Sequence, residues 1–452
     1  AAVALLAAGI AFNAYQNEKS KVDDLEAQVE GLQERIAQLE AEADEGGVLG
    51  GLEDLLGDEG LGGLEDLLGD EGLSGLEDLL GGDALGGLGG ATECLAEDAG
   101  GLLGGGSVEI PDDDPDAQYD AVAEWVENER GLQFEAVPEP TYVSADEMAT
   151  RVEEQIRADY PADEVRADEE LYTALGAIPA GTDLLDEYSE FVGSQVAGYY
   201  DPDTGELVVL GDGTEPFDGL ELTTIAHELE HALAHQALDF PIEDEVRAAD
   251  PDKQLAGLGL IEGDATLTMT RFQLGATNPI DLLGSLGSGE LQEQAEALEN
   301  APEYFARQLM FPYTEGLSFV CALESEGGWP AVDDAYANPP TTTAQVLFPE
   351  RYTGGEVAVD APDPQSPGAG WEEVRRMTFG AADLLFLIDR DAAEQWAGGE
   401  IAQFRSGDAA AVRISLVGQD DEGLCDAVTD WAETLDNATA TCNGTAVSVA
   451  IG

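Results

Sequence analysis

Apolar residues recur at helical spacing in the middle of the chain. Between about Leu220 and Leu238, the residues Ile225, Leu229 and Leu233 fall on one side of a helix and would anchor it in a core. A second apolar stretch, Leu255 to Phe272, is interrupted by an acidic step and predicts another helix. The two stretches predict a pair of helices that pack against each other.

Residues 109–452 as a whole mix helical and strand patterns. Periodicity predicts helices at 117–129, 145–158 and 371–389, and strands at 191–200, 206–211 and 412–417. The first two strands are joined by Asp201-Pro202-Asp203-Thr204-Gly205, which has the chemistry of a hairpin turn. The pattern indicates a domain of the α+β class.

Three segments of different character precede this domain. Residues 1–14 form an apolar run too short to span a bilayer, and we expect the end of a membrane anchor or signal segment there. Residues 15–45 have apolar positions at alternating three- and four-residue spacing, which predicts a short coiled coil and a route to homo-oligomers. Residues 46–108 contain an acidic, glycine-rich 12-residue repeat, which predicts a flexible linker.

Acidic residues dominate the charge. The chain has 96 Asp and Glu against 17 Lys and Arg, a formal net charge of −79. Such a surface repels itself in dilute salt, so the composition indicates adaptation to concentrated salt and a halophilic source of archaeal type. Nucleic-acid binding is disfavoured, because phosphate contacts need a basic surface.

The cysteines and two glycosylation sequons bear on location. The chain has four cysteines and no CxxC pair, so no thiolate zinc site is expected: Cys94, Cys321, Cys425 and Cys442. Cys425 and Cys442 bracket a short segment and could close a disulfide in an exported domain, whereas Cys321 is expected to be a buried thiol. The sequons Asn437-Ala438-Thr439 and Asn443-Gly444-Thr445 agree with an exterior location.

All three histidines of the chain lie within nine residues, in His227-Glu228-Leu229-Glu230-His231-Ala232-Leu233-Ala234-His235. One helical turn separates His227 from His231, so their imidazoles can bind a single ion. Glu228 flanks the same face, within reach of a water on that ion. This HExxH spacing predicts a Zn²⁺ site of the hydrolase type. The alternative is an amphipathic helix whose histidines only form hydrogen bonds.

Catalytic zinc sites use a third protein ligand, and Glu262 is the expected one. A carboxylate inside an apolar helix is costly to bury unless it is paired or bound to a metal. Asp264 is expected to orient one of the histidines from behind. His235 lies one turn beyond His231, but straight helix geometry keeps its ring away from the same ion. We therefore expect His235 beside the site, in a cleft wall or in the core.

These motifs resemble a known family. His227-Glu228-Leu229-Glu230-His231, followed by Glu262-Gly263-Asp264-Ala265, is similar to the gluzincin branch of zinc metallopeptidases. A closer likeness, to largely uncharacterised prokaryotic metallopeptidases, covers about Glu139 to the C-terminus and is carried by further segments: 195–202, 312–316 and 327–329. The resemblance implies a zincin-like fold, with a small mixed sheet packed on the HExxH helix and a largely helical C-terminal part. It also implies that His227, His231 and Glu262 bind zinc and that Glu228 is catalytic; His235 departs from the family's pattern.

In peptidases of this kind, a sheet edge beside the metal helix binds the substrate backbone by strand addition. Leu207-Val208-Val209-Leu210 is the candidate for that strand, although a central strand would have the same pattern. The oxyanion donor would be one of four residues: Tyr199, Tyr200, Tyr313 and His235. We select Tyr313, which follows Pro312 at the expected start of a helix and could project into a cleft. A plain aromatic core residue is the alternative for Tyr313.

The expected function is therefore a membrane-tethered zinc peptidase that acts on a peptide or protein substrate, with its catalytic domain outside the cell. Lys19 and Lys21, which follow the apolar run, favour the opposite orientation by the positive-inside rule, and this alternative stays open. Glu228 would accept the proton of the attacking water and pass it to the leaving amine. A catalytically silent binding module with the same fold and a structural surface protein are the two alternatives.

Overall fold

The structure is a computed structural model that describes residues 110–111, 114–195, 197–238, 250–276, 301–407, 409–420 and 423–452. The expected membrane anchor (1–14), coiled coil (15–45) and linker (46–108) lie outside the described residues. Among the residues that are described, no helix is both long and apolar enough to cross a membrane.

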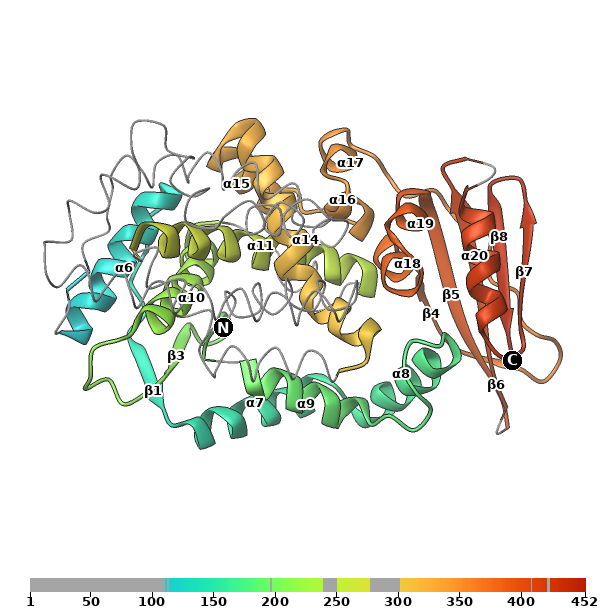
Figure 1. Ribbon diagram of the computed structural model, residues 1–452, viewed down its shortest axis with the longest axis horizontal. Coiled ribbons are helices and arrows are strands. Elements are labelled where there is room, and N and C mark those ends of the chain that lie inside the picture. The colour runs from blue at the N-terminus through green and yellow to red at the C-terminus, as the bar shows by residue number, and fades with distance from the viewer. Residues whose placement is uncertain are drawn as a thin grey trace, which may run out of the picture.

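Helices and strands mix along the described chain, which confirms the α+β class (Figure 1). The helices are α6 (Pro115–Arg130), α7 (Ala145–Asp159), α8 (Ala162–Ala174), α9 (Leu184–Gln195), α10 (Gly219–Ala237), α11 (Pro251–Ala276), α14 (Glu303–Gly327), α15 (Trp329–Ala337), α16 (Thr343–Leu347), α17 (Pro349–Thr353), α18 (Ala381–Leu387), α19 (Arg390–Glu394) and α20 (Gly423–Thr434). The strands are β1 (Pro140–Val143), β2 (Gly198–Asp201), β3 (Glu206–Leu210), β4 (Glu372–Thr378), β5 (Trp396–Ser406), β6 (Ala409–Gly418), β7 (Ala438–Asn443) and β8 (Ala446–Ile451).

A three-stranded sheet in the order β1-β3-β2 lies against α10. β3 runs parallel to β1 and antiparallel to β2, and it is the central strand. The prediction that Leu207–Leu210 forms the substrate-binding edge is therefore wrong, because both sides of this strand are already paired. β2 is the edge strand that packs on α10.

The segment before β2 also differs from the prediction. A strand was expected over 191–200, but residues 184–195 form α9 and only the last part of the segment belongs to β2. The aromatic and β-branched residues of this stretch favour a strand locally. Packing of α9 against α7 decides for a helix instead.

α10 begins at a strong sequence signal. The side chain of Asp218 accepts hydrogen bonds from the backbone N–H groups of Leu220 and Glu221, and the side chain of Glu221 accepts one from the N–H of Asp218. This capping box satisfies N–H groups that the first helical turn leaves without partners. The apolar face of the helix, which includes Ile225 and Leu229, is buried against Leu207 and Val209 of β3, as the periodicity predicted.

α11 and α14 cross at contact distance through glycines. A Cβ on Gly263 would lie 2.3 Å from the carbonyl oxygen of Gly316, and one on Gly316 would lie 2.3 Å from that of Gly259. Only glycine allows two helix backbones to approach this closely. The crossing therefore fixes the position of Glu262, which precedes Gly263, relative to α14.

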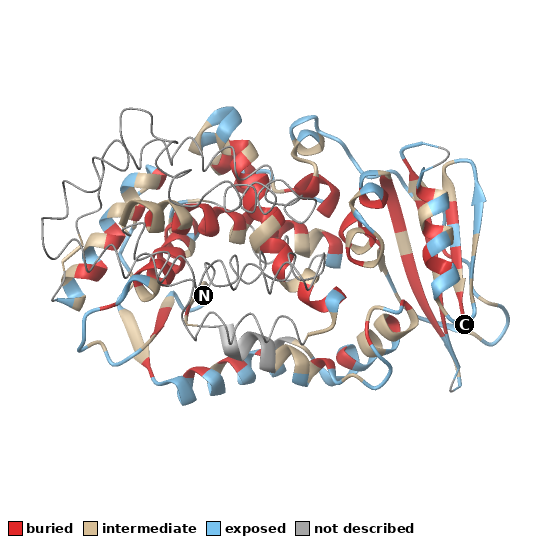
Figure 2. Cartoon of the chain, viewed as in Figure 1, coloured by how far each residue is buried: buried red, intermediate tan, exposed pale blue. Residues whose placement is uncertain are grey.

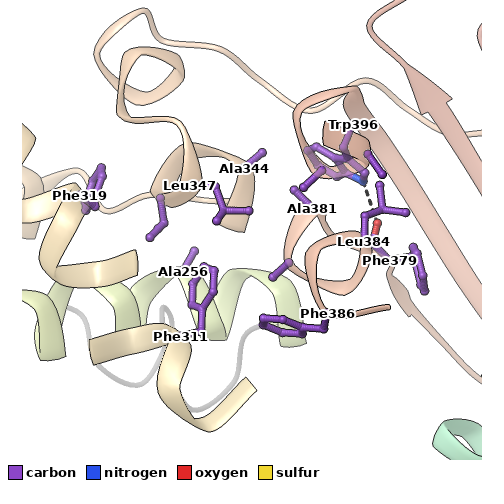
Figure 3. Close-up of a cluster of buried hydrophobic side chains, with 14 of the residues drawn as sticks. Ala256, Phe311, Phe319, Ala344, Leu347, Phe379, Ala381, Leu384, Phe386 and Trp396 are labelled. Carbon is purple, nitrogen blue, oxygen red and sulfur yellow. Dashed lines mark hydrogen bonds between the residues drawn. The ribbon is translucent and has the colours of Figure 1, made fainter. Parts of the chain in front are cut away.

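One apolar core continues from these helices into the C-terminal sheet. Figure 3 shows Ala256 and Phe311 in the helical half beside Ala344 and Leu347 of α16, and the cluster continues to residues near β5: Phe379, Ala381, Leu384, Phe386 and Trp396. The Nε1 of Trp396 donates a hydrogen bond of 2.8 Å to the carbonyl of Phe379. Buried residues line the facing sides of α11 and α14 and the middle of β5 and β6 (Figure 2).

The resemblance implied a largely helical C-terminal part, and this prediction is wrong. Residues 301–353 are mainly helical, but a five-stranded antiparallel sheet in the order β4-β5-β6-β8-β7 follows. The helix expected over 371–389 is β4 followed by α18, because residues 372–378 pair with β5. The strand expected at 412–417 is confirmed within β6.

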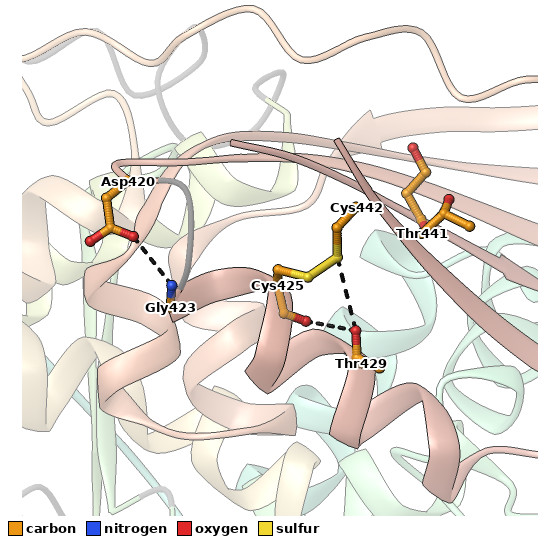
Figure 4. The surroundings of a disulfide bond; sticks show 7 residues. Asp420, Gly423, Cys425, Thr429, Thr441 and Cys442 are labelled. Atoms are coloured by element: carbon orange, nitrogen blue, oxygen red, sulfur yellow. Dashed lines mark hydrogen bonds between the residues drawn. A yellow bond between two sulfur atoms is a disulfide. The ribbon is translucent and has the colours of Figure 1, made fainter. Parts of the chain in front are cut away.

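Cys425 and Cys442, a pair that the sequence left open, form a disulfide that ties α20 to β7 (Figure 4). Beside it, the hydroxyl of Thr429 donates a hydrogen bond to the carbonyl of Cys425. The prediction of a buried thiol at Cys321 is wrong in one respect, because this fully buried residue is disulfide-bonded. Its partner lies outside the described residues.

Candidate metal centre

Two helices bring the candidate ligands together, and a third adds Tyr313. α10 presents His227 and His231 one turn apart, and α11 presents Glu262 opposite them. The glycine crossing described above holds α14 against α11, which places Tyr313 beside His227 with ring centroids 6.4 Å apart. Among the described residues, His227, His231 and Glu262 form a group whose ligand atoms all lie within 4.8 Å of one another.

The three candidate ligand atoms form a nearly equilateral triangle. The Nε2 atoms of His227 and His231 are 3.1 Å apart, and Glu262 Oε2 lies 3.2 Å from the first and 3.5 Å from the second. Two ligands bound about 2.0–2.1 Å from a tetrahedral zinc ion lie about 3.3–3.4 Å apart. The donor set, two imidazoles and one carboxylate, is that of a catalytic zinc site, so these residues fit the ion in chemistry and in spacing.

The charges around the triangle favour a positive charge at its centre. Burial lowers the pKa of His231, but Glu262 and then Glu228 and Glu230 outweigh it and raise this pKa to about 10. Burial raises the pKa of Glu262, but His231 and His227 outweigh it and hold this pKa well below its usual range. A metal cation would take over the positive charge that the protonated imidazole otherwise provides, and its binding would release a proton.

Glu228 is held at the edge of the triangle by the backbone of β2. Its Oε2 accepts a hydrogen bond of 2.8 Å from the N–H of Tyr200. Gly198 lies close by, where an added Cβ would stand 3.6 Å from Glu228 Cγ and 3.0 Å from the carbonyl oxygen of Val208. Burial raises the pKa of Glu228, which makes this carboxylate a better proton acceptor than an exposed one.

His235 lies apart from the triangle. It is exposed near the end of α10, and its Nδ1 is 2.9 Å from the hydroxyl oxygen of Tyr200. The ring of Tyr200 thereby links His235 to the strand whose backbone holds Glu228. The core location that was one alternative for His235 is wrong, because the residue is exposed, and the cleft-wall alternative stays a prediction.

Tyr313 stands in the middle of α14 and not at a helix start, since Pro312 lies inside that helix. Burial raises the pKa of Tyr313 well above its usual range, and the neighbouring Glu262 and Glu228 raise it further. The hydroxyl therefore stays protonated and can donate a hydrogen bond. The stacked ring of His227 keeps it at the site.

A buried ionic cluster lies behind His231. Glu230 Oε2 is 3.9 Å from His231 Nδ1, and Glu230 Oε1 is 3.5 Å from Nε of Arg130. Nη2 of Arg130 donates to Asp264 at 2.9 Å and to Asp333 at 3.0 Å. Asp264 was expected to orient a histidine, but its ion pair is with Arg130, and the carboxyl group closest to His231 Nδ1 in this cluster belongs to Glu230.

Of the three carboxyl groups that pair with Arg130, two have no exposed surface. The side chains of Glu230, Asp264 and Arg130 are all fully buried. Burial and then Asp264 raise the pKa of Glu230 well above its usual range, so Glu230 keeps a proton that it can donate to Asp264. The indole of Trp329 lies 4.1 Å from the Arg130 guanidinium and closes the other side by a cation–π contact.

Sequence reasoning missed three parts of the site: Arg130, Glu230 and the Tyr200 backbone. A backbone N–H leaves no trace in the sequence. Arg130 ends α6, and its role depends on how α6 packs against α10. The scarcity of basic residues was the one available signal, because an arginine in so acidic a chain is worth locating.

No protein-family model, no curated protein and no solved structure matches this chain.

Proposed function

We propose that the chain is a zinc-dependent peptidase that hydrolyses peptide bonds with Glu228 as general base. The observation that carries the proposal is the triangle of His227 Nε2, His231 Nε2 and Glu262 Oε2, with sides of 3.1, 3.2 and 3.5 Å. A buried carboxylate of raised pKa at its edge is the second requirement of water-activating chemistry.

His227, His231 and Glu262 would hold the ion. Zinc in such a site acts as a Lewis acid that polarises a carbonyl and acidifies water. Glu228 is anchored at Oε2 by the Tyr200 N–H, and no described residue hydrogen-bonds Oε1. The free oxygen accepts the proton of the attacking water and then delivers it to the leaving amine. The anchored oxygen keeps the carboxylate from rotating away between these two transfers.

Tyr313 is the proposed donor to the oxyanion that forms on the substrate. Its protonated hydroxyl lies on the α14 side of the triangle, across from the helix that carries Glu228. A fixed donor aimed at developing negative charge is the largest electrostatic contribution in many hydrolases. Tyr200 and His235 are less suited, since they bond each other at the exposed end of α10, and the hydroxyl of Tyr199 bonds Arg151. The hydroxyl of Tyr313 bonds Glu262, one of the proposed ligands, which supports its place beside the triangle.

The setting we propose is outside the cell, with the chain tethered to a membrane. The Cys425–Cys442 disulfide supports an oxidising exterior compartment. The apolar run at 1–14 supports an anchor. The substrate class is a peptide or an unfolded protein segment.

The test is the Glu228→Gln variant, which keeps the shape of the side chain and removes its basicity. We expect peptide hydrolysis in molar KCl to fall by about 10²–10⁴-fold while zinc content is unchanged. Glu124→Gln, which removes an exposed charge from α6, is the matched control and keeps full activity. Undiminished hydrolysis by Glu228→Gln would contradict the mechanism. A zinc-loaded wild type that cleaves no member of a diverse peptide library would favour the catalytically silent binding module.

A further inference from the structure

The C-terminal sheet ends in two very different edge strands. β4 carries charged side chains and a register irregularity between Glu373 and Arg375. Charges and bulges are the usual means by which proteins keep an open edge from pairing with another chain. β7, at the opposite edge, reads Ala-Thr-Ala-Thr-Cys-Asn and has no charged residue, in a chain with 96 acidic ones.

β7 is also open to solvent. It pairs with β8 along its whole length, it is the last strand in the sheet order, and every residue in it is exposed or half-buried. Figure 1 shows it at the outer end of the molecule. A regular, uncharged, threonine-rich edge of this kind is suited to pairing with a second copy of itself.

Two sequons lie at the two ends of this strand. Asn437-Ala438-Thr439 begins in the turn before β7, where Asn437 has φ 57°. Asn443-Gly444-Thr445 begins at the last residue of β7 and forms the tight hairpin to β8, in which Gly444 has φ 60° and Asn443 pairs with Ala446. No other asparagine of the chain starts a sequon.

Both asparagine side chains are accessible for modification. Asn437 and Asn443 are exposed, and neither side-chain amide is hydrogen-bonded to another described residue. The hydroxyl residue of the first sequon, Thr439, is exposed and that of the second, Thr445, is half-buried. The adjacent Cys425–Cys442 disulfide belongs to the same oxidising compartment in which N-glycosylation is completed.

We propose that Asn437 and Asn443 are N-glycosylated and that the two glycans cover the edge of β7. In this transfer, a bond forms between the side-chain nitrogen and C1 of the first sugar of a lipid-linked oligosaccharide. The bond between C1 and the lipid phosphate breaks, the lipid phosphate leaves, and the amide loses one proton, with no change in oxidation state. The glycans provide on β7 the hydrated, bulky barrier that charges provide on β4. This inference does not depend on the metal centre.

The test is peptide mass spectrometry on the full chain purified from the cells that naturally make it. We expect a glycan mass on the peptide that contains Asn437 and Asn443, and none on Asn338, which is exposed but followed by proline. Thr439→Val should remove the glycan from Asn437 alone, and Thr445→Val from Asn443 alone, whereas the corresponding Thr→Ser variants should keep both. Unmodified asparagines in the wild type would overturn the proposal, and modification of one alone would overturn it for the other.

The covering role has a separate readout. The Asn437→Gln/Asn443→Gln double variant from the same cells should show a larger mass by light scattering than the wild type, rising with protein concentration. An unchanged mass at all concentrations would overturn the role of the glycans as a cover for β7.

Discussion

The helices of the candidate metal centre bury ionisable side chains, whereas the central strands of the C-terminal sheet bury none. α10 and α11 bury His227, Glu228, Glu230, Asp252 and Asp264, whereas β5, β6 and β8 bury no charged side chain within their bounds. A buried charge is expensive unless it is paired, and an ion pair in the interior rarely stabilises a fold more than apolar residues of the same size.

The difference indicates a division of roles. The sheet and the apolar core that it shares with α11 and α14 supply stability. The helices contain buried ionisable groups that destabilise the fold and are explained by a chemical role. Carboxyl groups with shifted pKa values that lie together indicate a functional site. Changes at buried charges should therefore be far more disruptive than similar changes on the sheet.

The largest stability effect should follow from Arg130→Met. Removal of the guanidinium leaves Asp264 buried without the cation that it pairs with, and we expect a loss of about 3–5 kcal/mol in the free energy of unfolding. Urea denaturation in molar KCl measures it. Arg405→Met on β5 is the control, because the partly exposed ion pair of Arg405 with Glu170 should contribute about 0–1 kcal/mol. Equal losses in the two variants would remove the contrast between the two regions.

Asp252 makes the stability of the helical half depend on pH. It is buried, it accepts hydrogen bonds from Thr343, and burial raises its pKa from the ordinary 3.8 to about 7. The folded state therefore binds a proton that the unfolded state releases, so this contribution is complete below about pH 4 and is lost as the pH rises through 7. The loss should be on the order of 2–4 kcal/mol.

Asp252→Asn cannot lose this proton, so the variant should match the wild type near pH 4 and exceed it in unfolding free energy at pH 8. Urea denaturation at the two pH values measures the difference. Asp430→Asn, which removes an exposed charge on α20, corrects for the general loss of negative charge. A constant difference between Asp252→Asn and wild type at both pH values would contradict the assignment.

Gly263→Ala should have a smaller effect that is specific to the site. Its Cβ would overlap the Gly316 carbonyl and push α11 away from α14, at a cost of about 1–3 kcal/mol. Because Glu262 precedes Gly263, zinc affinity should fall as well. Gly219→Ala is the control, since a Cβ there has nothing within 4 Å. Unchanged zinc affinity in Gly263→Ala would show that the crossing does not position Glu262.

Local spacing predicted the parts of the site that lie on one helix, and burial cost predicted Glu262. The side chains of His227, His231 and Glu262 do lie together, because helix periodicity is fixed and a carboxylate in an apolar helix needs a partner. Arg130 could not be placed, since nothing in α6 shows that it packs behind α10.

For the fold as well, only the elements set by local sequence signals were predicted. The metal helix and the β2–β3 turn follow from local signals, whereas β4 does not. Glu, Arg and Met favour a helix in isolation, and pairing with β5 overrides that preference. The β-rich C-terminal part was missed for the same reason, because sheet order depends on partners distant in the sequence.

The most direct test of the account is the zinc content of the purified full chain, measured by elemental analysis after dialysis in molar KCl. We predict about one zinc per chain in the wild type and in His235→Ala, and none retained in His231→Ala or Glu262→Gln. Wild-type protein without zinc after incubation with the metal, or full zinc retention in Glu262→Gln, would contradict the metal centre.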